Sequence, residues 1–188
     1  MTLAWNRSLI ALCALTLGAP LAAARAEKAA APPTDAEIAA IVVAANQVDI
    51  DAGKLASDKA QSADVRTLAQ RMVTDHTGVN QQASALVQKL GVTPKSNATS
   101  QSLAKGGDDN LKKLRGLSGA AFDRAYVSNE VTYHQAVIDA LDQALIPNAK
   151  NAELRDLLVK VRPAFESHLE HAKHLQSKLG SGGAGATK

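Results

Sequence analysis

Three of the five histidines in the sequence stand three residues apart in the segment ESHLEHAKH, residues 166 to 174. Imidazole is a frequent ligand of transition metals, so this spacing raises the question of a metal site. On a helix, a step of three residues turns the side chain by about 300°. His168, His171 and His174 therefore fan around the axis, and at most two of them can face the same way.

Four segments with helical periodicity each have a polar residue that interrupts the apolar pattern near the middle of the segment. These residues are Asp49, His76, His134 and His168. If the segments are antiparallel neighbours in a bundle, their midpoints lie at the same level. We therefore expect the four side chains to converge in the core. His168 is then the inward histidine of its segment, whereas His171 flanks it and His174 faces solvent.

Three imidazoles and one carboxylate form a ligand set that suits zinc, copper, nickel or iron. The nearest other carboxylates are Asp75, Glu130 and Glu166. In metal sites such groups orient the ligands through hydrogen bonds. The sequence therefore indicates a possible metal ion as cofactor, with these carboxylates around its ligands.

The spacing disfavours a di-iron oxidase. Ferritin-like di-iron proteins carry Glu-x-x-His on two helices, but here Val73, Val131 and Phe165 stand three residues before the histidines. The residues themselves first indicate a buried hydrogen-bonded network, in which Asp49 and Asp75 accept hydrogen bonds from imidazole N–H groups, because buried polar groups must be paired whether or not a metal is present. A metal site is the alternative to this network.

Periodicity and capping signals indicate four helices of similar length, each with one apolar stripe. The first begins at a capping box formed by Thr34 and Glu37. The second ends at Gly91, Pro147 stops the third, and Pro163 should kink the fourth.

The second and third helices are joined by a long segment, residues 92–117, which is polar and glycine-rich with at most a short helix at 108–114. A bundle with only hairpin turns needs no connection of this length. The pattern predicts an all-α domain over residues 34–179, a ferritin-like four-helix bundle with a long crossover between helices 2 and 3. The crossover places the third helix parallel to the second.

The first 26 residues predict a Sec-type signal peptide, with cleavage expected after Ala26. Its apolar run, residues 9–17, is too short to span a bilayer. We therefore expect a periplasmic or secreted protein with no membrane span after cleavage. Residues 27–33 are then a linker, and residues 180–188 a flexible tail.

Cleavage would reduce the 21 basic residues to 19 by removing Arg7 and Arg25, against 18 acidic residues. A nearly neutral chain with few aromatic side chains has neither the charge nor the stacking surfaces of a nucleic-acid binder. Gly-x-Ser-x-Gly, His-Glu-x-x-His, Cys-x-x-Cys and phosphate-loop motifs are absent. The sequence therefore carries no sign of the hydrolase, redox or nucleotide chemistry that these motifs perform.

The segments DIDAGKLASDKA, RMVTDHT, FDRAYVSNEVTYH and RPAFESHLEHA resemble an exported bacterial family, domain of unknown function 4142, over about residues 35 to 179. The family is regarded as ferritin-like. Its pattern falls on Asp49, Asp75, His76, Phe122, Asp123, Tyr126, His134, Pro163 and His168. The resemblance implies that Tyr126 also lies near the site. The chain departs from the family at Asp49, where the usual residue is Glu, so the carboxylate reaches one methylene less far.

These observations predict a non-enzymatic, exported helical bundle, a metal-binding or stress-related module whose polar cluster lies at the midpoint. The alternative is a metal-dependent ferritin-like oxidase or a metal-storage protein. A protein partner and a homo-oligomer both remain open.

Overall fold

The computed structural model describes residues 31–181, which form helices and contain no strand. This confirms the all-α prediction. The predicted signal peptide and residues 182–188 of the predicted tail lie outside the described residues. Within residues 31–181, no helix is long and apolar enough to cross a membrane.

The first two long helices form a hairpin, α1 (Asp35–Lys59) and α2 (Ala63–Lys89). The predicted capping box is present, because Thr34 accepts from the Glu37 backbone N–H and the Glu37 carboxylate accepts from that of Thr34. After α2, Gly91 adopts φ 63°, the left-handed conformation that ends a helix at little cost for glycine.

The predicted crossover is itself a helix, α3 (Ala98–Arg115), which corrects the expectation of a mainly irregular segment. Asn97 caps it by accepting from the Ser100 backbone N–H at 2.9 Å. Gly107 packs against α1, where an added Cβ would lie 2.6 Å from a Val48 methyl. The glycine thus allows close approach of two helices and does not mark a loop.

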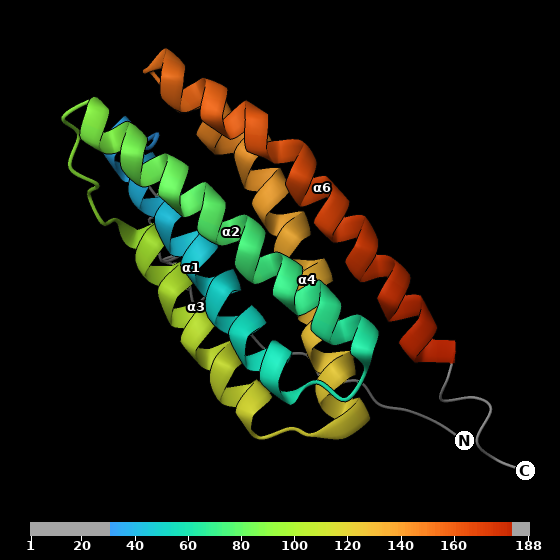
Figure 1. Ribbon diagram of the computed structural model, residues 1–188. Coiled ribbons are helices and arrows are strands. Elements are labelled where there is room, and N and C mark those ends of the chain that lie inside the picture. Colours follow the sequence, from blue (N-terminus) through green and yellow to red (C-terminus); the bar gives the residue numbers. More distant parts are fainter. Residues whose placement is uncertain (1–30, 182–188) are drawn as a thin grey trace, which may run out of the picture. The chain divides into compact units, whose positions relative to one another are not determined.

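The second half of the chain contains α4 (Gly119–Ala140), a π-helical turn (Leu141–Leu145), a short α5 (Ile146–Asn148) and α6 (Ala152–Ser181). In Figure 1, α4 runs in the same direction as α2. The helix that connects them in the sequence, α3, lies along α1 and returns the chain to the end of the bundle where α2 began. Pro163 lies inside α6 without ending it. The helix also includes Gly180 and Ser181, which the sequence placed in the flexible tail.

An aspartate holds each of the two interhelical turns, α1–α2 and α5–α6, through hydrogen bonds to backbone N–H groups. Asp123, near the start of α4, accepts from the backbone N–H groups of residues 61 and 62 in the α1–α2 turn at 3.0 and 2.8 Å. Asp35, at the start of α1, accepts from those of residues 150 and 151 before α6 at 2.7 and 2.9 Å. An aspartate from α4 thus binds the turn of the α1–α2 pair, and an aspartate from α1 binds the turn that leads from α4 to α6.

The two turns also have similar sequences. AQSADVRTL (60–68) aligns with AKNAELRDL (149–157), and the aligned arginines Arg66 and Arg155 both donate to the carbonyls of the preceding turn. The offset is 89 residues for the arginines (155 − 66) and 88 for the clamping aspartates (123 − 35). The π-helical turn lies between the two aligned sets and accounts for the extra residue, because such a turn accommodates an insertion.

The core consists of two apolar clusters that meet at the middle of the bundle. One contains Ile38 and Ile41 of α1 together with Leu158 of α6, and the other contains Ala56 of α1 and Phe122 of α4. On α1, the buried polar residues lie between the positions that belong to the two clusters. The fold therefore places a polar layer at the midpoint.

Candidate metal centre

The four residues that interrupt the apolar stripes lie together in the polar layer. Asp49 projects from α1, His76 from α2, His134 from α4 and His168 from α6. None of the four is more than 3% exposed. Their ring and carboxylate atoms therefore have no bulk water to satisfy them, so their partners in the protein decide what the cluster can do.

His76 is oriented by Asn46, a buried residue one turn before Asp49. The Asn46 amide donates to the Val42 carbonyl at 2.8 Å, which turns its oxygen toward His76 Nδ1 at 2.7 Å. Since an amide oxygen only accepts, His76 Nδ1 carries the hydrogen. His76 Nε2 then faces Asp49 Oδ2 at 2.9 Å.

His134 is oriented by its own helix. Its Nδ1 lies 3.1 Å from the Glu130 backbone carbonyl, which can only accept a hydrogen bond. Nδ1 therefore donates, and Nε2 points to the same Asp49 oxygen at 3.4 Å. The Asp49 carboxylate thus faces the Nε2 atoms of two imidazoles.

His168 is oriented by Asp75 on α2. Its Nε2–H donates to Asp75 Oδ2 at 2.8 Å, which leaves Nδ1 as the nitrogen with a free lone pair. That Nδ1 is buried and has no hydrogen-bond partner among the described residues. All three histidines therefore have one nitrogen tied to an acceptor and one available.

The three imidazole rings are close enough to share an ion. A nitrogen from each of His76, His134 and His168 lies within 4.8 Å of the other two. Two ligands of a tetrahedral zinc-like ion, each about 2.0–2.1 Å from it, lie about 3.3 Å apart. The 3.4 Å between His134 Nε2 and Asp49 Oδ2 matches that separation.

The charges of the cluster depend on burial. Burial alone would raise the pKa of Asp49, but His76, with help from His134 and Glu130, holds that pKa below its ordinary value. Burial lowers the pKa of His134, and it lowers that of His168 to about 4. The centre at neutral pH therefore combines an ionised carboxylate with at least two neutral imidazoles, the forms that bind metal.

Glu130 lies deeper in the cluster than its sequence position suggested. It is fully buried, and a ligand atom of it lies within 4.8 Å of those of Asp49 and His134. Burial, reinforced by the Asp49 charge, raises the pKa of Glu130 well above its ordinary value. Glu130 is therefore a neutral acid that can donate to Asp49, and the buried Tyr126 hydroxyl interacts with it.

Three other predicted positions lie outside the centre. The Glu166 carboxylate bonds to Arg162 at 2.7 Å and is 49% exposed, so it does not orient a histidine. His171 is half-buried and His174 is exposed, as the helical fan indicated. Of the three flanking carboxylates, only Asp75 and Glu130 contact the cluster.

Two contributors were missed in the sequence. Asn46 precedes Asp49 by three residues, a spacing that puts both on one helix face, and this signal was available. Tyr133, next to His134, donates its hydroxyl to the Ala45 carbonyl at 2.8 Å and packs edge-on against the His134 ring.

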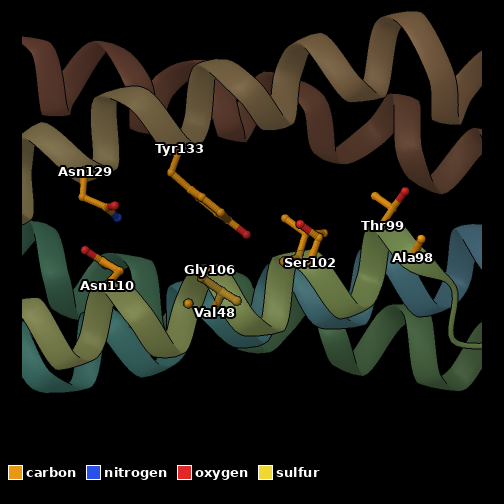
Figure 2. Close-up of a pocket in the computed structure, with 10 residues that line it drawn as sticks. Val48, Ala98, Thr99, Ser102, Gly106, Asn110, Asn129 and Tyr133 are labelled. Atoms are coloured by element: carbon orange, nitrogen blue, oxygen red, sulfur yellow. The ribbon is translucent and has the colours of Figure 1, made fainter.

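Tyr133 also separates a surface groove from the interior. The groove, about 570 Å³, lies between α3 and α4 and is lined by small residues and by the amides of Asn110 and Asn129 (Figure 2). Behind Tyr133 is a small internal cavity of about 30 Å³ whose wall is apolar except for Asn46, His76 and Tyr133 itself. The Asn46 amide, His76 Nδ1 and the Tyr133 hydroxyl already have partners.

The fold and the site together define an all-helical bundle with a buried centre of histidines and carboxylates. The chain belongs to the DUF4142 family, a domain of unknown function, which matches residues 19–175. The resemblance found in the sequence is thereby confirmed. Among curated proteins, no sequence matches this chain.

Two solved structures share the fold. A predicted secreted protein of the DUF305 family from Streptomyces coelicolor is 15% identical with a TM-score of 0.65, and the match covers 78% of this chain and 93% of that one. CopM in its Cu(II)-bound form is 15% identical with a TM-score of 0.61, and the match covers 79% and 99%. At this identity the likeness concerns the fold alone.

Proposed function

We propose that this protein is an exported metal-binding protein that holds one divalent transition-metal ion between His76, His134, His168 and Asp49. One observation carries the proposal: each imidazole is anchored by one nitrogen, a nitrogen from each ring lies within 4.8 Å of the other two, and His76 and His134 both face Asp49. Metal-ligating histidines are anchored in this way, since the outer hydrogen bond fixes the tautomer and the ring orientation.

The donor set fits a borderline ion. Three neutral nitrogens and a carboxylate suit Cu(II), Zn(II), Ni(II) or Fe(II), and among divalent ions copper binds such sites most tightly. One of the two structures that share this fold is CopM in its Cu(II)-bound form, which makes copper the first ion to test. We further propose the ferritin-like arrangement for the bundle, which the parallel course of α2 and α4 supports (Figure 1), and export by the predicted signal peptide, residues 1–26.

The test is metal analysis of protein exported from its own signal and purified without a histidine tag. We expect one equivalent of metal per chain, removable by chelator and restored by Cu(II) or Zn(II). His134→Ala should abolish stoichiometric binding, whereas His174→Ala should retain it, because His174 is exposed on α6.

The alternative, a buried hydrogen-bonded network without metal, makes a different prediction. A purely hydrogen-bonded cluster gives no stoichiometric metal, and adding metal leaves the melting temperature unchanged. If His134→Ala and His174→Ala bind metal equally, the proposed site is wrong. Binding to the folded state alone should raise the melting temperature of the wild-type protein, more at higher free metal.

A metal-dependent oxidase is a second candidate, because Glu130 places another carboxylate beside Asp49 and His134. Such an enzyme would consume dioxygen when loaded with Fe(II). Oxygen-electrode measurements on the wild type and on Glu130→Gln separate the two functions, since a binding protein consumes none and an oxidase should slow when the carboxylate is lost.

A further inference from the structure

One side of the buried cluster is only one residue away from solvent. Among the described groups that hydrogen-bond the three histidines, those of His76 and His134 are at most 3% exposed. Asp75, the partner of His168, is 36% exposed. Asp75 therefore links the centre to the surface, at the seam between α2 and α6.

Arg71 covers this link. Its Nε lies 3.3 Å from Asp75 Oδ2, and its Nη2 lies 3.3 Å from the Ser167 hydroxyl across the seam on α6. Both contacts are long for hydrogen bonds, and the arginine side chain is 42% exposed. Exposed ion pairs of this kind contribute little stability, so the guanidinium can leave Asp75 readily.

The groove on the opposite side is less suited to an ion. Beyond Tyr133 the path to His76 crosses the internal cavity, whose wall is mostly apolar. A hydrated cation that crossed it would lose water without gaining ligands, which is costly. A surface carboxylate, in contrast, attracts a cation and replaces part of its hydration shell.

We propose that metal ions reach the centre through the α2–α6 seam, with Asp75 as the first ligand they meet and Arg71 as a removable counter-charge. This inference rests on the proposed function. An arriving cation displaces the Arg71 guanidinium from the Asp75 carboxylate. The His168 ring is the last barrier, since one of its nitrogens faces Asp75 and the other is buried on the inner side.

Four variants separate this route from its alternatives. Arg71→Ala removes the cover. Asp75→Asn removes the charge but keeps an oxygen that accepts from His168 Nε2–H. Lys113→Ala removes one exposed positive charge from α3, on another face, as the matched control. Tyr133→Phe releases the hydroxyl that anchors the ring to Ala45 and tests the groove.

The measurement is stopped-flow transfer of Zn(II) from a chromophoric chelator to metal-free protein, and back, alongside equilibrium stoichiometry and melting temperatures. Arg71→Ala should speed both uptake and release by about tenfold while the stoichiometry stays at one. Asp75→Asn should slow uptake by about tenfold and weaken its dependence on salt. Lys113→Ala should behave like the wild type, and Tyr133→Phe should not speed uptake.

The outcomes distinguish this inference from the proposed function. Faster uptake by Tyr133→Phe with no change in Arg71→Ala overturns the seam route in favour of the groove. Wild-type rates in both Arg71→Ala and Asp75→Asn, with binding retained, overturn it as well. If wild-type protein takes up no stoichiometric Zn(II) or Cu(II), the proposed function fails and the route fails with it. Should Asp75→Asn fail to fold, Arg71→Ala alone still decides, because it removes only exposed contacts.

Discussion

His76 Nε2 lies 2.9 Å from Asp49 Oδ2 in the centre of the bundle, while His76 Nδ1 donates to Asn46. A lone pair on Nε2 and a carboxylate oxygen repel at this distance, and a metal ion shared by the two atoms would relieve that repulsion. The Asn46 anchor therefore directs His76 and Asp49 toward a common ion.

Asn46→Ala should weaken metal binding without removing any ligand. The substitution frees His76 Nδ1–H and lets the ring change tautomer and orientation, and loss of such an anchor costs about 10–100-fold in affinity. Competition titrations with a chelator measure the change. Asn110→Ala, which removes an amide of α3 in the α3–α4 groove, is the control. Equal affinities for the two variants would contradict the anchoring role.

The metal-free protein should lose stability as the pH falls from about 6.5 to 4. Burial holds the pKa of His168 at about 4, so between these values the unfolded chain binds a proton that the folded chain does not. The contribution is fully present above pH 6.5, and its loss amounts to about 3 kcal/mol. Asp49 adds a further loss at lower pH, because its lowered pKa gives stability above the ordinary value of 3.8.

Urea unfolding across this pH range provides the measurement. His168→Gln should flatten the curve between pH 6.5 and 4, whereas His174→Ala should leave its slope unchanged. A slope that is the same in His168→Gln and in wild type would show that another group titrates.

Glu130→Gln should stabilise the metal-free protein at neutral pH. The raised pKa of Glu130 means that it is protonated when folded and ionised when unfolded, so it costs stability as the pH rises above its ordinary value of 4.5. Glutamine keeps a similar shape and a donor toward Asp49 but does not ionise. The melting temperature should therefore rise at pH 7 and change little at pH 4. A fall at pH 7 would contradict a neutral Glu130.

The sequence located the polar layer because a polar residue at the middle of an apolar stripe is costly unless paired. Helical geometry also explains why Glu130 lies inside the cluster and Glu166 lies outside it. Glu130 stands four residues before His134, about 40° away around the helix, and shares its inward face. Glu166 stands two before His168, about 200° away, and must point to solvent. The same rule, applied to each carboxylate, would have sorted them.

Other features depend on contacts between distant segments and could not be predicted. α3 was predicted only as a short helix over residues 108–114, because Gly106 and Gly107 were interpreted as a loop signal, whereas Gly107 is needed where α3 meets Val48. The repeat was hidden by low identity and by the change of offset at the π-helical turn. The Asp123 clamp joins α4 to the α1–α2 turn, more than 60 positions away in the sequence, so only the folded chain brings them together.

The two clamping aspartates should contribute unequally and independently to stability. Asp123 is 2% exposed, and its carboxylate is a charged acceptor for two backbone N–H groups, so Asp123→Ala should cost about 1.5–3 kcal/mol. Asp35 is partly exposed, and Asp35→Ala should cost about 0.5–2 kcal/mol, as for a helix cap.

The clamps lie at opposite ends of the bundle (Figure 1), and substitutions without shared partners add to within about 0.5 kcal/mol. The double variant should therefore lose the sum of the two single effects in urea unfolding. Metal affinity should remain that of wild type in all three proteins, since neither aspartate contacts the centre. If the double variant loses clearly more unfolding free energy than the sum, the two clamps act together rather than independently. If metal affinity falls in any of the three proteins, the turns help to position the ligands.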